Sequence, residues 1–282
     1  MKSFLSSLEK RRLRCRHGMP HLRWQSCLFV TVNAVILSLL LFDGPVGGDH
    51  VPPTIRRIGL MLTDFGKSDW IIIVSAFLLF QGWASSRTAT SVRHRLQALR
   101  VSWIGCYLLT SIALSGLVAN LLKRLIGRAR PEHFQDYGIF SFSSFSGHSF
   151  ESFPSGHATT IGAFFAAFAL LFPRYRIAFV ACALWFGMTR VMVSAHYPSD
   201  VIAGLALGGW FSLMIAIVYA RHNLLFRPGV GGWPQPKRLF PAIENPAPLE
   251  RRAWSVFSGK INPLRGYRGS WFPAGKSGRS QA

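Results

Sequence analysis

The chain has 282 residues, half of them apolar and only 15% charged, and its 32 Lys and Arg far outnumber its 11 Asp and Glu. Long apolar runs with basic flanks indicate a membrane protein and argue against a soluble domain. We therefore expect the positive charge to lie on anionic lipid headgroups, with no nucleic-acid partner. The cysteines have no paired spacing and predict neither a disulfide framework nor a metal site; they are Cys15, Cys27, Cys106 and Cys182.

Apolar runs between residues 24 and 220 predict an all-α bundle of six membrane-spanning helices. The expected spans are 24–42, about 70–83, 101–122, 155–172, 177–193 and 198–220. A basic segment, 1–23, precedes them, and residues 221–282 are rich in Gly, Pro and basic residues, which predicts a largely disordered tail. The first span has no signal cleavage site, so we expect it to be retained.

Three features between the spans are predicted from local pattern. Apolar residues at helical spacing over 54–65 predict a short helix lying on the membrane surface. A basic link is expected between the second and third spans, with Arg87, Arg93, Arg95 and Arg100. Small residues in the third span, including Gly116, predict close helix packing.

The distribution of positive charge predicts the orientation. With six spans, three quarters of the 32 Lys and Arg fall on the side that holds both termini. The excess of positive charge normally marks the cytoplasmic side. We therefore expect both termini in the cytoplasm of a bacterium and a multi-pass protein of its inner membrane. Three short polar clusters then lie together at the outer face.

The first cluster ends the third span and contains Lys123, Arg130 and Pro131. If the helix continues past the membrane surface, Lys123 and Arg130 share one of its faces, and Pro131 favours a helix end at Arg130. Two fixed cations at a helix end suit a dianionic group, although a basic patch on lipid headgroups would have the same composition.

The second cluster is Pro154-Ser155-Gly156-His157, which directly precedes an apolar helix. Ser155 is a plausible N-cap, and the free N–H groups of such a helix start bind anions. Gly156 permits close approach of the backbone, and His157 is placed to act as a general acid. Ser146-Gly147-His148 nearly repeats the tripeptide but lacks the Pro and the helix, so we expect it to have a structural role.

The third cluster comprises Thr189 and Arg190, followed by His196 and Asp200. Pro198 fits a first helical turn and would place Asp200 just inside that helix. The spacing of His196 and Asp200 allows the carboxylate to accept from one ring nitrogen, which leaves the other nitrogen free to attack phosphorus.

These three ordered motifs resemble the signature of the type 2 phosphatidic acid phosphatase superfamily, which includes vanadium haloperoxidases and bacterial acid phosphatases. The resemblance covers roughly residues 101–210, and it departs from the usual pattern at Thr189, where Ser is the rule. It implies a phosphohistidine formed on His196, orientation by Asp200 and protonation of the leaving group by His157. The implied phosphate ligands are Lys123, Arg130, Ser155, Gly156 and Arg190, with Thr189 as a possible addition. No metal and no cofactor is implied, and Arg124 and Arg128 are expected to face lipid headgroups.

The resemblance predicts a phosphatase site at the periplasmic face that acts on a lipid phosphate or lipid pyrophosphate. It leaves four substrates open: undecaprenyl diphosphate, phosphatidylglycerol phosphate, phosphatidic acid and the phosphates of lipid A. A phosphotransferase and a non-catalytic lipid-phosphate binder are the alternatives, whereas a haloperoxidase would usually be soluble. The aromatic loop 134–153 is expected to form a lid or a wall for lipid entry. The oligomeric state is left open.

Overall fold

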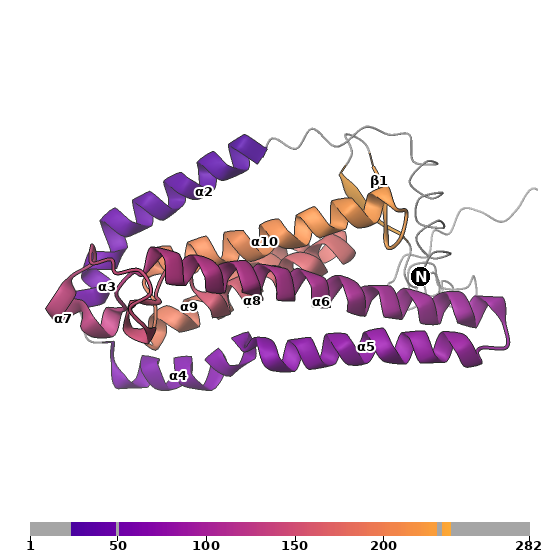
Figure 1. Ribbon diagram of the computed structural model, residues 1–282, viewed down its shortest axis with the longest axis horizontal. Coiled ribbons are helices and arrows are strands. Elements are labelled where there is room, and N and C mark those ends of the chain that lie inside the picture. Colours follow the sequence, from indigo (N-terminus) through magenta and orange to yellow (C-terminus); the bar gives the residue numbers. More distant parts are fainter. Residues whose placement is uncertain (1–23, 49–50, 230–232, 238–282) are drawn as a thin grey trace, which may run out of the picture. The chain divides into compact units, whose positions relative to one another are not determined.

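The computed structural model describes residues 24–48, 51–229 and 233–237, and this part of the chain is almost entirely helical (Figure 1). Its α-helices are α2 (Trp24–Ser38), α3 (Gly44–Gly48), α4 (Pro53–Thr63), α5 (Ser68–Thr88), α6 (Val92–Ile126), α7 (Phe134–Tyr137), α8 (Gly156–Leu171), α9 (Arg176–Met192) and α10 (Pro198–Arg221). A short antiparallel hairpin pairs β1 (Phe226–Pro228) with β2 (Pro234–Pro236). The all-α prediction is confirmed.

Five described segments are long and apolar enough to cross a membrane. They are Trp24–Gly47, Pro53–Thr88, Val92–Ile126, Pro173–Met192 and Pro198–Arg221. A sixth apolar helix, α8, has only 16 residues, or about 24 Å of length, which is less than the roughly 30 Å of a hydrocarbon core. Neighbouring helices bury much of α8, and the six-helix bundle is confirmed with one short member.

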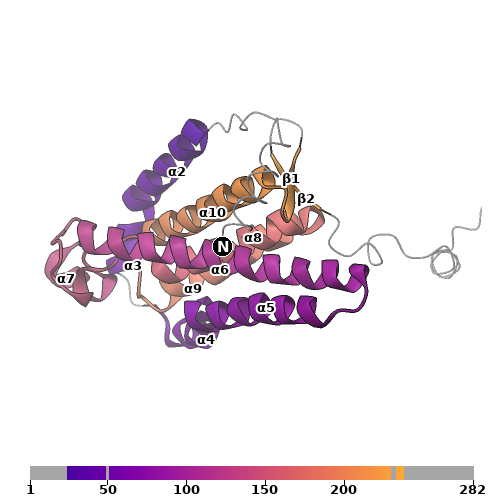
Figure 2. The same cartoon turned by 45° about the vertical axis from the view of Figure 1, so that its right-hand side comes forward.

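Close helix pairs form at small residues. A Cβ on Gly82 of α5 would lie 2.4 Å from the Ser102 nitrogen of α6, and one on Gly208 of α10 would lie 2.1 Å from the Thr159 carbonyl oxygen of α8. Figure 2 shows α8 and α10 running side by side. Glycine is required because any side chain would push these backbones apart. Gly116, which was expected to pack closely, faces open space among the described residues, so that prediction is wrong.

The predicted basic link is mostly helix. Helix α6 begins at Val92, with the Ser91 hydroxyl accepting from the His94 N–H at 3.2 Å. Arg93, Arg95 and Arg100 therefore lie in α6 and Arg87 in the last turn of α5, leaving a connection of only residues 89–91. Arg, Leu and Gln form helices well and Ser91 supplies the N-cap, so the helix extends well beyond the apolar run.

The short helix expected over 54–65 is present as α4. A 3-10 turn, Asp64–Gly66, joins it to α5, and α4 continues in the direction of α5 in Figure 1. Gly59 lies against Met192 and Val193, where a Cβ would be 2.9 Å from the Met192 Cβ. Helix α4 thus covers the end of α9. Its placement on the membrane surface stays a prediction.

The start of the predicted disordered tail is structured. Leu225 and Phe226 are buried with Tyr107 and Tyr219, and the Phe226 and Tyr107 rings are 5.3 Å apart between centroids. Burial of these two apolar side chains supplies the free energy that orders the hairpin. Residues 1–23 and 238–282, where the basic N-terminus and most of the tail were predicted, lie outside the described residues.

Candidate active site

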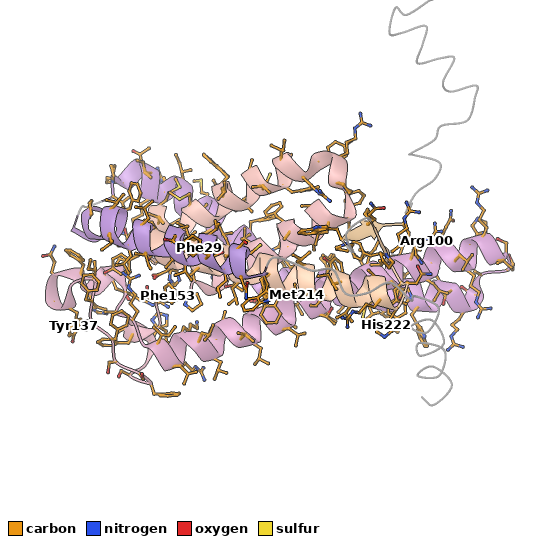
Figure 3. All side chains as sticks on the ribbon, turned by 90° about the horizontal axis from the view of Figure 1, so that it is seen from above. Phe29, Arg100, Tyr137, Phe153, Met214 and His222 are labelled. Atoms are coloured by element: carbon orange, nitrogen blue, oxygen red, sulfur yellow. The ribbon has the colours of Figure 1, made fainter. Side chains whose placement is uncertain are left out.

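The three polar clusters meet at one end of the bundle. Successive helices α6, α8, α9 and α10 alternate in direction, so the end of α6, the start of α8, the end of α9 and the start of α10 lie together (Figure 1). Figure 3 labels Tyr137 and Phe153 at this end, and Arg100 and His222 at the opposite end. The fold therefore brings together residues that are far apart in sequence.

Helix α6 ends four residues before the predicted position. Gly127 is left-handed (φ +62°) and its N–H bonds the Lys123 carbonyl at 3.0 Å. A Cβ there would lie 2.0 Å from the Ser143 carbonyl oxygen, so only glycine fits. Arg130 follows in extended backbone, and its N–H bonds the Ser149 carbonyl. The expected shared helical face of Lys123 and Arg130 is wrong, although both cations interact electrostatically with site histidines.

The outer cations are paired with loop groups. Lys123 Nζ lies 3.6 Å from one Glu151 carboxylate oxygen, and Arg124 Nε lies 3.5 Å from the other. Arg130 Nε donates to the His148 carbonyl at 3.0 Å, and burial lowers the pKa of Arg130 from its usual value. Glu151, which the sequence did not single out, therefore pairs with both Lys123 and Arg124.

The start of α8 has the predicted geometry. Ser155 is its N-cap, accepting from the Ala158 N–H at 3.4 Å, and the Ser155 N–H donates to the Asp200 carbonyl at 3.1 Å. A Cβ on Gly156 would meet nothing within 4 Å among the described residues, so the helix start faces open space. His157, in the first turn, interacts electrostatically with Arg190 and His196.

The near-repeat Ser146-Gly147-His148 starts no α-helix, and its structural role stays a prediction. His148 begins a 3-10 turn, His148–Phe150, without a side-chain cap, and its carbonyl fixes Arg130. The same loop carries exposed aromatic side chains at Phe140, Phe142 and Phe145. Its role as a lid or lipid wall stays a prediction.

Helix α9 presents Arg190 to the site and turns Thr189 away. Arg190 Nη1 donates to the Thr63 hydroxyl of α4 at 2.8 Å, whereas its Nε is buried and has no hydrogen-bond partner among the described residues. The Thr189 hydroxyl donates to the Phe186 carbonyl of its own helix at 2.7 Å, and the residue is buried. The Thr189 hydroxyl is thus engaged within its own helix, and its role as a phosphate ligand stays a prediction. An Arg nitrogen buried without a partner suits an anion.

His196 is buried, with 4% of its surface exposed, on the connection between α9 and α10. Its Nδ1 lies 2.9 Å from the Ser152 carbonyl oxygen and 3.7 Å from Asp200 Oδ2. A carbonyl only accepts, so Nδ1 carries the proton and Nε2 keeps its lone pair. Burial lowers the pKa of His196 despite the opposing charge of Asp200, which favours this neutral form. Asp200 Oδ2, the predicted acceptor of the Nδ1–H, lies farther from Nδ1 than the Ser152 carbonyl oxygen, which the sequence did not predict as an acceptor.

Asp200 lies in the first turn of α10, after Pro198, as predicted. Its Oδ1 accepts from Arg128 Nη1 at 2.6 Å, and its Oδ2 accepts from the Ser152 hydroxyl at 2.5 Å and from the Tyr197 N–H at 3.0 Å. Arg128 is only 1% exposed, so the expectation that it faces headgroups is wrong. Arg124, in contrast, is largely exposed.

Comparisons with known proteins identify the group to which the chain belongs. The PAP2 superfamily profile matches residues 104–224. A lipid A 1-phosphatase of Rhizobium etli is 66% identical over 232 residues, covering 82% of this chain and 100% of that protein. The lipid A 1-phosphatase of Rhizobium johnstonii is 64% identical over 241 residues, covering 85% and 99%. The chain belongs to the PAP2 superfamily.

A more distant PAP2 relative extends the comparison. The undecaprenyl-diphosphatase BcrC of Bacillus subtilis is 30% identical over 192 residues, which is 67% of this chain and 86% of that protein. The chain is accordingly a multi-pass membrane phosphatase that acts on lipid phosphates, as the resemblance predicted. Among the described residues of this PAP2 protein, no group of three or more His, Cys, Asp or Glu is placed to hold a metal ion.

Four contributors to the PAP2 site lie outside the expected phosphate ligands and catalytic residues. Asp43 and Arg128 form a buried ion pair at 2.8 Å, Ser152 contacts both His196 and Asp200, and Glu151 pairs with Lys123. Asp43 had one signal in the sequence, since a carboxylate at the end of an apolar span is costly unless it is paired. Arg128, Ser152 and Glu151 had no such signal, because their partners lie far away in the sequence.

Proposed function

We propose that this PAP2 protein removes the 1-phosphate of lipid A at the periplasmic face of the inner membrane. Two relatives that the chain covers almost end to end, at 66% and 64% identity, carry the name lipid A 1-phosphatase. The more distant relative acts, by its name, on undecaprenyl diphosphate, and it is only 30% identical. The proposal thus narrows the four candidate substrates to one.

The proposed chemistry assigns roles to the two histidines. Nε2 of His196 attacks phosphorus, so that a P–N bond forms while the bond from phosphorus to the lipid oxygen breaks. His157 gives its proton to that leaving oxygen. A water molecule then attacks phosphorus, gives its proton back to His157 and breaks the P–N bond, releasing phosphate. Throughout, Nδ1 of His196 keeps its proton and donates it in a hydrogen bond to the Ser152 carbonyl.

One observation carries this proposal: Arg190 Nε, which has no hydrogen-bond partner within the described part of the chain, lies in the same buried site as the neutral His196. Arg190 acts electrostatically on both His157 and His196. A buried cation with an unused donor stabilises the negative charge that builds up on the phosphoryl oxygens. Lys123, Arg130 and the start of α8 surround the same space and add charge and backbone N–H groups.

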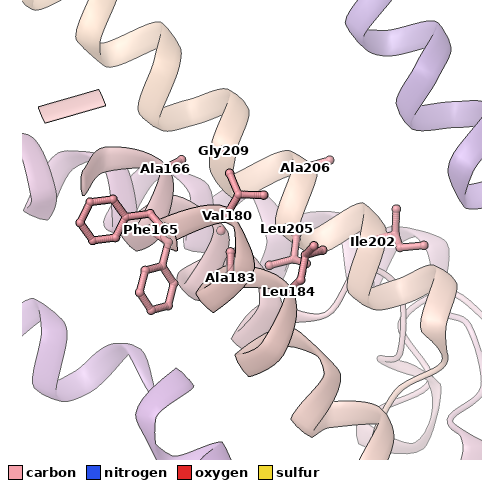
Figure 4. Close-up of a pocket in the computed structure, with 11 residues that line it drawn as sticks. Phe165, Ala166, Val180, Ala183, Leu184, Ile202, Leu205, Ala206 and Gly209 are labelled. Atoms are coloured by element: carbon pink, nitrogen blue, oxygen red, sulfur yellow. The ribbon is translucent and has the colours of Figure 1, made fainter. Parts of the chain in front are cut away.

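An apolar cavity supports a lipid substrate. It has a volume of about 310 Å³ and lies between α8, α9 and α10, where Phe165, Leu184 and Leu205 are among its lining residues (Figure 4). Leu205 also contacts Gly187, one helical turn before Arg190. The cavity is lined by the same three helices that carry His157, Arg190 and Asp200, and its apolar lining suits an acyl chain.

Phosphate release from the purified full-length protein in detergent tests the proposal. Lipid A, undecaprenyl diphosphate, phosphatidylglycerol phosphate and phosphatidic acid are supplied separately with EDTA, beside His196→Ala and a control, His148→Ala. We expect release from lipid A in the wild type and in the control, and none in His196→Ala. Mass spectrometry of the lipid should show loss of the 1-phosphate. Preference for another lipid, a requirement for metal or transfer to a second lipid would refute the assignment.

The orientation and division of the chain are part of the proposal. We place both termini in the cytoplasm, residues 24–220 in the membrane domain and 221–282 in a cytoplasmic tail. The distribution of Lys and Arg supports this arrangement. Reporter fusions at residue 282 and within the 134–153 loop test it: the loop reporter should be active only if it is exported. The opposite pattern would invert the topology.

A further inference from the structure

A buried ionic cluster connects the first membrane helix to the active site. Asp43 ends the π-helical turn Leu39–Asp43 that follows α2, and it is fully buried. Its Oδ2 accepts from Arg128 Nη2 at 2.8 Å and from the Ser199 hydroxyl at 2.5 Å, and its Oδ1 accepts from the Ser199 N–H at 3.1 Å. Asp43 thereby fixes both Arg128 and the start of α10.

Arg128 uses its guanidinium group entirely within the protein. Nη1 donates to Ser199 Oγ at 2.8 Å and to Asp200 Oδ1 at 2.6 Å, Nη2 donates to Asp43, and Nε donates to the Ile139 carbonyl at 3.4 Å. The guanidinium carbon also lies 4.3 Å from the centre of the Tyr197 ring. With both carboxylates bound, Arg128 has little capacity left for phosphate.

Such a cluster is costly for stability alone. Burying charged groups carries a large desolvation penalty, and well-packed apolar side chains of similar volume often stabilise a fold equally well. The cluster has one cation against the two carboxylates of Asp43 and Asp200, so its balance is negative. The carboxylate oxygen of the cluster that lies nearest the site is Asp200 Oδ2, 3.7 Å from His196 Nδ1.

We infer that Arg128, held by Asp43, is a positioning residue that fixes Asp200 and Ser152 and thereby orients His196 for attack. This inference rests on the proposed role of His196 as nucleophile. Asp200 Oδ2 accepts a hydrogen bond from the Ser152 hydroxyl, and the Ser152 carbonyl accepts one from the Nδ1–H of His196. Without the hydrogen bond from Arg128 to Oδ1, the Asp200 carboxylate is free to rotate and the Ser152 hydroxyl loses its acceptor. The Ser152 carbonyl is then no longer held in place to accept from His196 Nδ1–H.

Because the cluster is charged, substitutions within it should shift the pH dependence of kcat in a direction set by the charge that is removed. Four charged or titratable groups act electrostatically on His196. They are Asp200 of α10, Arg190 of α9, Arg130 of the connection after α6 and His157 of α8. Arg128→Gln removes a positive charge, which favours either protonated His196 or protonated Asp200, and both changes move the acid limb of kcat to higher pH. Asp43→Asn removes a negative charge and moves that limb to lower pH.

The test uses the full-length protein in detergent with Arg128→Gln, Arg128→Lys, Asp43→Asn and the exposed control Arg93→Gln. We expect Arg128→Gln to lower kcat roughly 100-fold with KM nearly unchanged, and Arg128→Lys to recover part of the loss. The acid limb should shift in opposite directions in Arg128→Gln and Asp43→Asn, and not at all in Arg93→Gln. Shifts in the same direction, or a rise in KM alone, would overturn the inference.

A second measurement separates this inference from the proposed function. The same proteins, labelled with ¹⁵N-histidine, report the tautomer and the titration of His196 by NMR without any substrate. We expect the wild type to carry the proton on Nδ1, and the titration to move upward in Arg128→Gln and downward in Asp43→Asn. An unmoved titration refutes the positioning role even if lipid A is hydrolysed. Absence of phosphate release with a moved titration refutes only the proposed function.

Discussion

Two arginines of one motif, separated only by Ala129, have opposite surroundings. Arg128 is 1% exposed and bonds two carboxylates, whereas Arg130 has a carbonyl as its hydrogen-bond acceptor and lies among the cations near the site histidines. A guanidinium saturated by carboxylates is neutralised, while one held by a carbonyl keeps its charge for an anion. The motif therefore supplies one arginine that is neutralised by carboxylates and one that keeps its charge, which we propose binds the phosphate.

The same contrast applies to the whole site. Among the described residues, Lys123, Arg130 and Arg190 form an outer layer whose anionic partners are distant or absent. Asp43, Arg128 and Asp200 form an inner layer in which each charge has a close partner. The outer layer can exchange a partner for phosphate, but the inner layer cannot without leaving a buried charge unpaired. Substitutions in the two layers should thus affect different constants.

The largest expected effect is in the outer layer, at Arg190. Arg190→Ala should lower kcat/KM roughly 1,000-fold and abolish binding of phosphate or vanadate, because the only buried Arg nitrogen without a partner in the described chain is lost. Arg128→Gln, as the inner-layer comparison, should bind phosphate nearly as the wild type does. Titration calorimetry with phosphate measures both, and equal losses of affinity would remove the distinction between the layers.

A smaller loss is expected where the inner layer reaches His196. Ser152→Ala removes the hydroxyl that donates to Asp200 at 2.5 Å but keeps the carbonyl that accepts from His196. We expect kcat to fall roughly tenfold with KM unchanged, because the hydrogen bond to the Asp200 carboxylate is lost while the one from His196 to the Ser152 carbonyl remains. Ser152→Thr should restore most of the rate in a steady-state assay. If Ala and Thr were equally slow, shape and not the hydroxyl would matter.

Phosphate affinity should increase when Glu151, the carboxylate that pairs with Lys123 in the outer layer, is neutralised. Glu151→Gln frees Lys123 from a carboxylate 3.6 Å away. Because the pair is partly exposed, the change in phosphate affinity should be modest, with the Kd falling up to about fivefold. Asp136→Asn, an exposed change in the same connection, provides the control. Weaker binding in Glu151→Gln would show that Glu151 orients Lys123 instead of competing for it.

The smallest expected effect is the change of rate between pH 8 and pH 6. Burial lowers the pKa of His196 below the usual value of about 6.5, so the imidazole stays neutral as the pH falls through 6.5 and kcat should stay nearly flat. The unfolded chain takes up a proton on this histidine below about pH 6.5, so stability should fall as the pH drops towards the lowered pKa. Rate and thermal unfolding profiles measure both, and a half-maximal kcat at pH 6.5 would contradict the burial argument.

Local features of the chain were predictable from sequence. The six apolar helices, the Ser155 cap of α8 and the position of Asp200 after Pro198 follow from hydropathy, capping and proline geometry, which act within a few residues. The end of α6 was misplaced because Gly127, and not Pro131, terminates the helix, and the connection after α5 was misplaced because helix propensity carries α6 past its apolar part.

The sequence by itself determined the family, the membrane architecture and the three clusters, since motif order and apolar length are properties of the chain alone. Only the tertiary structure decided which partners the motif residues have. Arg128 meets Asp200 across 72 residues, Asp43 meets Ser199 across 156, and Thr189 turns back on its own helix. Side chains beyond a helix end point to wherever distant partners satisfy their charge, and no local pattern encodes those partners.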